Sequence, residues 1–155
     1  MRQVIESWEG YGRSLLRIIL AFTFSLHGYR HMFGLFPTSG GRRAAVPMAL
    51  DGLPPIMGSL EIVGGLLLLL GLFTRPTAIV LCAELLAAYV YSAAPRSLWP
   101  IRNGGNEVLL YILVFAYFAA AGGGPWSLDH LLQKRRNRDS AELRSIRAQQ
   151  GTETA

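Results

Sequence analysis

The chain has 155 residues, of which 51% are hydrophobic and 16% are charged. An average soluble domain contains fewer hydrophobic and more charged residues, so this composition argues against a soluble enzyme and favours a membrane protein. The single cysteine, Cys82, excludes an internal disulfide and a Cys-x-x-Cys redox motif.

Four apolar segments have about the 20-residue length that crosses a bilayer core. They are expected at residues 12–36, 54–73, 76–94 and 105–121. A soluble helical bundle would show polar stripes at a 3.6-residue period, but IVGGLLLLLGLF has no polar residue. The first segment is not a typical signal peptide, because HGYRHMFG follows it without a small-x-small cleavage site. The sequence therefore predicts an all-α fold, an integral membrane four-helix bundle with antiparallel helices.

The connections between these segments differ in length. A long loop rich in glycine and proline follows the first segment, whereas TRP joins the second and third in a tight hairpin, with Pro76 in the first helical turn. After the fourth segment, Ser127 is placed to cap a short interfacial helix that has Asp129 in its first turn. The domain plan is a cytoplasmic segment at 1–11, the membrane domain at 12–130, and a basic, partly disordered cytoplasmic tail at 131–155.

Lysine and arginine residues predict the orientation of the chain, because cytoplasmic loops carry an excess of both. The two termini and the second loop hold Arg2, Arg13, Arg75, Lys134, Arg135, Arg136 and Arg138. The first and third loops hold Arg42, Arg43, Arg96 and Arg102. Both termini are therefore expected in the cytoplasm, with the protein in the inner (plasma) membrane. The basic tail favours contact with anionic lipid rather than nucleic acid.

Ionisable side chains inside the apolar segments are functional candidates, because an isolated charge in hydrocarbon costs at least ~2.5 kcal/mol. The candidates are Arg17, His27, His31, Glu61, Glu84 and Glu107. Helical periodicity directs the first three inward, whereas Arg30 lies on the opposite flank of its helix. One interpretation is an outward-opening pocket in which glutamates exchange protons and histidines bind a ligand. The alternative is an ionic core that only sets helix packing.

A metal or haem site is a weaker interpretation of the same segment. His27 and His31 have the i, i+4 spacing of paired ligands, but two histidines alone specify no site. We therefore expect no metal site and no intrinsic cofactor, and we assign no catalytic residue.

Several stretches resemble the DoxX-like family of four-helix membrane proteins, from Arg17 to Asp129. HGYRHMFG resembles the family's HG-x-x-K-x-FG, and GSLEIVGGLLLLLGLFTRPTA resembles its E-x-x-G-G-L-L-L-L-x-G-L-x-T-R. GNEVLLYILVFAYFAAAGGGPWSLD resembles its G-x-E opening and G-x-G-x-x-S-L-D close. His31 departs from the pattern, because the family commonly has lysine there. A histidine is charged only if its partners favour the charged form.

The resemblance implies an inner-membrane protein. Some members of the family are associated with quinone-linked oxidoreductases. The first hypothesis is therefore a membrane subunit, non-catalytic or quinone-interacting, with an oxidoreductase partner subunit. In that hypothesis Arg17, His27, His31, Glu61, Glu84 and Glu107 form the substrate or quinone pocket. One alternative is a small proton-coupled transporter, which would act as a homo-oligomer because four helices rarely enclose a transport path alone. The other is a membrane scaffold or assembly factor.

Overall fold

The computed structural model describes residues 2–33 and 53–153, and the described residues form helices without any β-strand. The helices are α1 (Arg2–Phe33), α2 (Leu53–Leu70), α3 (Thr74–Ala88), α4 (Pro100–Asn103), α5 (Asn106–Ala121) and α6 (Leu128–Glu153). A π-helical turn, Tyr89–Ala93, continues α3. The fold is therefore all-α, as the sequence predicts. The first loop, residues 34–52, lies outside the described residues.

The helix boundaries agree with the expected apolar segments, except that α1 begins ten residues earlier than residue 12. Thr74–Ala93 is long and apolar enough to cross a membrane, and Ile56–Leu70 and Asn106–Ala121 are shorter apolar helices. Pro76 lies in the first turn of α3, as expected. Helix α4 is a single turn with its proline at the first helical position, and it was not predicted from the sequence.

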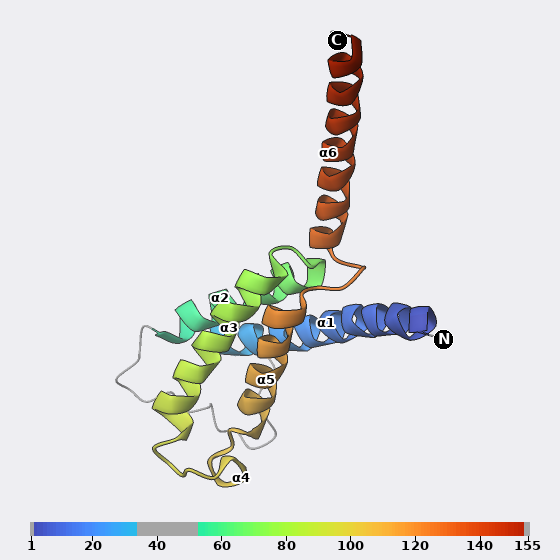
Figure 1. Cartoon of the computed structure of the whole chain (residues 1–155). Helices are drawn as coiled ribbons and strands as arrows, with labels where there is room; N and C mark the ends of the chain where they lie inside the picture. The colour runs from blue at the N-terminus through green and yellow to red at the C-terminus, as the bar shows by residue number, and fades with distance from the viewer. Residues whose placement is uncertain (1, 34–52, 154–155) are drawn as a thin grey trace.

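Two antiparallel pairs form the body of the molecule, with the pair α1 and α2 crossing the pair α3 and α5 (Figure 1). The buried core lies where the four helices meet and consists of Ala21, Phe24, Leu68, Ala78, Leu81, Leu85, Phe115 and Phe118. Phe24 packs edge-on against Phe115 at a centroid distance of 4.8 Å, which links the two pairs. Large apolar side chains cover the outer faces, among them Ile19, Val63 and Ile79. Such a surface is suited to lipid rather than water.

Small residues set the distance between α1 and α2. A Cβ added at Gly28 would lie 2.8 Å from the carbonyl oxygen of Gly58 and 2.9 Å from the Cβ of Glu61. Real side chains do not tolerate such distances, so only glycine allows this crossing. Ala21 and Ser25 continue the same contact toward Gly65. Glu61 is thereby held against the backbone of α1.

The last helix differs from the expected short interfacial helix and disordered end. Helix α6 continues from Leu128 to Glu153 and projects away from the other helices (Figure 1). Residues 131–144 are exposed on all sides, because charged and polar side chains occupy every face and leave no apolar stripe to pack. Residues 149–153, at the end of the tail that was expected to be partly disordered, belong to this helix, whereas residues 154–155 lie outside the described residues.

Candidate functional site

Arg17 is fully buried in the middle of α1, and among the described residues it donates hydrogen bonds only to backbone carbonyls. Its Nη1 binds the carbonyl of Leu68 and, at 2.8 Å, that of Leu69. Its Nε donates to Gly123 at 2.9 Å and its Nη2 to Trp126 at 2.8 Å. The last carbonyls of a helix have no intrahelical donor and carry partial negative charge. A guanidinium at the end of α2 therefore supplies hydrogen-bond donors and a compensating positive charge.

Asp129 makes the complementary contact at the start of α3. Its carboxylate accepts the backbone N–H groups of Phe73 and Thr74, both at 2.8 Å. Phe73 has a φ of 50°, a conformation that L-residues rarely adopt, and Gly71 has a φ of 67°. The two positive φ angles reverse the chain between α2 and α3, and Asp129 holds the reversed backbone while it caps the helix.

Ser127 completes this junction. Its hydroxyl oxygen accepts the backbone N–H of His130 at 3.2 Å, which confirms the expected cap at the start of α6. Its hydroxyl donates to the carbonyl of Gly124 at 2.6 Å. We call Arg17, Ser127, Asp129 and the backbone groups they bind the Arg17–Asp129 junction. It ties α1, the α2–α3 turn and the start of α6 together with charge-assisted hydrogen bonds.

Glu61 and Glu84 form a second polar region, which we call the carboxyl pair. Glu61 on α2 is 2% exposed, and its carboxyl group interacts electrostatically with that of Glu84 on α3. Both carboxyl oxygens of Glu84 are buried, and neither has a hydrogen-bond partner among the described residues. A buried polar group in this state has unused hydrogen-bonding capacity, which is costly to maintain.

His27 lies in an aromatic environment. Its ring is parallel to that of Phe24 at a centroid distance of 6.5 Å and tilted to that of Tyr111 at 6.3 Å. Sequence reasoning did not single out Tyr111, because a tyrosine in an apolar helix gives no signal of its partner. The side chains of Arg30 and His31 lie outside the described part of the structure.

The structure does not bring all six predicted residues together. Glu107 is exposed in the first turn of α5, where a carboxylate complements the positive end of the helix macrodipole. Arg17 binds carbonyls at the end of α2 and, within the described residues, makes no ion pair with either member of the carboxyl pair. Within the described residues, no three metal-ligating side chains come together.

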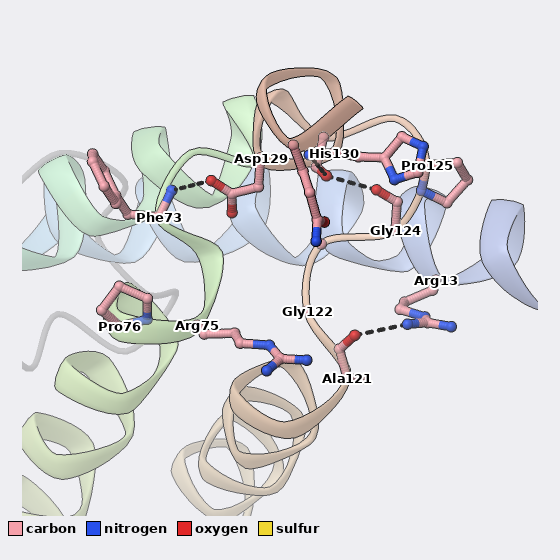
Figure 2. A pocket seen from close by; sticks show the side chains of 13 residues that line it. Arg13, Phe73, Arg75, Pro76, Ala121, Gly122, Gly124, Pro125, Asp129 and His130 are labelled. Atoms are coloured by element: carbon pink, nitrogen blue, oxygen red, sulfur yellow. Dashed lines mark hydrogen bonds between the residues drawn. The ribbon is translucent and has the colours of Figure 1, made fainter. Parts of the chain in front are cut away.

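The structure has a cavity of about 600 Å³ beside the Arg17–Asp129 junction, and none of the six predicted residues lines it. Its walls are the start of α3, the 121–125 backbone, the first turns of α6, and Arg13 of α1 (Figure 2). Arg13 donates to the carbonyl of Ala121 at 2.7 Å. A second cavity, of about 530 Å³, shares His130 and Gln133 with the first and extends along α6. Sequence reasoning missed this region, although TRP and SLD, two of the matched stretches, meet here.

A family model described as DoxX matches residues 12–93, which include α1 from residue 12 onward, α2, and the α3 helix with its π-helical end. The chain belongs to the DoxX family. It is accordingly a membrane protein, and the exposed apolar faces of α1, α2 and α3 are consistent with lipid contact.

Two relatives of this DoxX protein extend the similarity beyond the matched family segment. An uncharacterized protein of Haemophilus influenzae is 38% identical over 136 residues, which cover 84% of this chain and 98% of the relative. The uncharacterized membrane protein Rv3486 of Mycobacterium tuberculosis is 27% identical over 132 residues, covering 77% of this chain and 80% of the relative. No solved structure matches the chain significantly.

Proposed function

We propose that this DoxX protein is a four-span subunit of the inner membrane in which the carboxyl pair exchanges protons with a quinone-type ligand. The observation that supports this is Glu84, whose two buried oxygens have no hydrogen-bond partner among the described residues and which adjoins a second buried carboxyl. Ionisable groups within a membrane lower stability, so those that are present usually serve a function.

The residues of the pair fit a ligand with carbonyl oxygens. A protonated carboxyl of Glu84 can donate one hydrogen bond to a carbonyl, and Glu61 is the nearby group that can exchange a second proton. The apolar surroundings, including Leu81 and Leu85 on α3, favour a lipid-soluble ring over a charged metabolite. When bound, a quinone would accept electrons supplied by a partner oxidoreductase, since the chain's one thiol offers no dithiol chemistry.

Purification of the full-length protein with its native lipid tests this function. We expect quinone to co-purify with the wild type and to be lost in Glu84→Gln and Glu61→Gln at unchanged protein abundance. Glu107→Gln is the matched control, because Glu107 is an exposed carboxylate on α5 and should leave the bound quinone unchanged. A wild-type preparation with neither quinone nor a redox partner would overturn the proposal.

The proposed orientation places both termini in the cytoplasm, in line with the excess of arginine and lysine around the termini and the α2–α3 turn. Single cysteines at Arg102 and Ser140, in a Cys82→Ala background, test it with a membrane-impermeant thiol reagent. In intact cells we expect labelling at position 102 and none at position 140. Labelling of position 140 would reverse the orientation.

A membrane scaffold is the second candidate function. It is favoured by Arg17, which directs its donors to internal backbone carbonyls and so acts in packing rather than in ligand contact. If the carboxyl pair has the same role, Glu61→Gln and Glu84→Gln would change the amount of protein in the membrane but leave activity per molecule intact.

A further inference from the structure

We propose that the cavity beside the Arg17–Asp129 junction is a binding site for a phosphate anion, either a lipid headgroup or soluble phosphate. The inference is independent of the quinone proposal, because neither Glu61 nor Glu84 lines this cavity. Its cationic groups are Arg13 from α1 and Arg75 from α3, with His130 and Gln133 of α6 as further polar walls.

Arg75 is the main available cation of the cavity. It is exposed, and its side chain makes no hydrogen bond or ion pair within the described residues. Figure 2 shows Arg75 directed toward the backbone at Gly122, and a Cβ built at that glycine would lie 3.5 Å from the Nε of Arg75. The backbone at Gly122 thus lies in van der Waals range of the guanidinium. A planar guanidinium with free donors matches the geometry of phosphate oxygens.

Arg13 approaches the same backbone from the other side (Figure 2). One of its terminal nitrogens binds the carbonyl of Ala121, and the other lies 3.7 Å from Glu9, a carboxylate that is 65% exposed. Its Nε is buried and has no hydrogen-bond partner among the described residues. Because this Nε is buried, the donor of Arg13 that a phosphate oxygen could reach is the terminal nitrogen near Glu9, which is held by the 3.7 Å ion pair alone. Glu9 offsets part of the charge of Arg13.

The acidic group in the cavity does not cancel these cations. Both oxygens of Asp129 accept backbone N–H groups of the α3 start, so its charge is offset by the positive end of that helix. Next to the cavity, the second cavity along α6 adds Lys134 and Arg138. The local field is therefore positive and attracts anions.

Aromatic side chains near the cavity indicate that the phosphate could belong to a lipid headgroup. Phe73 lines the cavity and is 63% exposed, and neighbouring Trp126 is 56% exposed. Exposed aromatic rings near arginines are typical of the boundary between hydrocarbon and headgroups. A phosphate at this level would belong to an anionic lipid, whereas one entering from the water phase would be soluble.

The experiment uses the full-length protein and two probes. In the lipid arm, native mass spectrometry compares retention of phosphatidylglycerol and phosphatidylcholine. In the soluble arm, inorganic phosphate is titrated against the thermal stability of protein in phosphatidylcholine nanodiscs. The variants are Arg75→Gln, Arg13→Gln and the control Arg102→Gln, which changes an exposed arginine on α4. Arg75→Gln removes no internal hydrogen bond, so its fold should be preserved.

We expect the wild type to bind one of the probes and Arg75→Gln to weaken that binding by about tenfold, the loss typical of one charge-assisted hydrogen bond. Arg13→Gln should weaken it as well, and Arg102→Gln should leave it unchanged. Preferential retention of phosphatidylglycerol identifies the headgroup as the source, and stabilisation by inorganic phosphate identifies soluble phosphate. The proposal is overturned if neither probe binds the wild type, or if Arg75→Gln and Arg13→Gln both bind as the wild type does.

Discussion

The Arg17–Asp129 junction and the carboxyl pair both bury ionisable groups, but they satisfy them differently. Arg17 donates to four backbone carbonyls and Asp129 accepts two backbone N–H groups. Glu84 has two buried oxygens without a hydrogen-bond partner among the described residues, and its electrostatic neighbour is another carboxyl. A buried ionisable group with satisfied hydrogen bonds fixes structure, whereas an incompletely satisfied one is retained at a cost in stability. The difference separates a structural region from a candidate site.

Removing the Arg17 side chain should have the largest effect on stability. Arg17→Ala removes the side-chain donor from the carbonyls of Leu69, Gly123 and Trp126, and each unsatisfied buried group costs ~1–3 kcal/mol, whereas the carbonyl of Leu68 still accepts the N–H of Gly71. We expect the free energy of unfolding to fall by at least about 3 kcal/mol, measured by denaturation in detergent or as lost abundance in membranes. Arg17→Lys keeps the charge but cannot reach all these carbonyls, so it should be intermediate. An Arg17→Ala variant with wild-type stability would show that the junction is not structural.

Closing the gap between α1 and α2 should have the next largest effect, and it acts on the carboxyl pair. Gly28→Ala places a methyl group 2.8 Å from the carbonyl oxygen of Gly58, so the helices must separate and displace Glu61. We expect a loss of about 1–3 kcal/mol, read from thermal denaturation. Gly12→Ala is the control on the same helix, because nothing lies within 4 Å of the added carbon. It should stabilise α1 by up to about 1 kcal/mol, so the two variants differ in sign.

Removing the cap of α3 should have a smaller effect. Asp129→Ala deprives the N–H groups of Phe73 and Thr74 of their acceptor, and loss of a helix cap costs about 1–2 kcal/mol. Asp129→Asn keeps one acceptor oxygen but removes the charge, so it should lose less. Melting temperatures of the two variants test the order. If Asp129→Asn proved as unstable as Asp129→Ala, the charge rather than the hydrogen bonds would hold the turn.

The sequence predicted the elements of the fold better than the partners of its polar groups. Apolar length located α2, α3 and α5, and the serine before Leu128 located the start of α6. Periodicity placed Arg17 inward, but its acceptors are carbonyls at the end of one helix and in a glycine-rich segment, and carbonyls have no signature in a sequence. Glu107 was expected inside because it begins an apolar helix. Its exposure depends on how α5 packs against α3, which periodicity alone does not determine.

Replacement of Glu84 should have the smallest effect on stability. The sign of the change in the free energy of unfolding is informative, because it shows whether the carboxyl stabilises the fold. Exchanging a buried, incompletely satisfied polar group for an apolar group of similar size is often neutral or stabilising. We therefore expect Glu84→Leu to keep or raise the free energy of unfolding, within about 1 kcal/mol of the wild type, while it abolishes ligand binding by the carboxyl pair. Glu84→Gln, which keeps the shape but cannot exchange a proton, should show the same loss of binding at unchanged stability. Denaturation and quinone content measured on the same preparations separate the two effects. A strongly destabilised Glu84→Leu variant would mean that the carboxyl is satisfied after all, and the carboxyl pair would then belong to the same structural class as the Arg17–Asp129 junction.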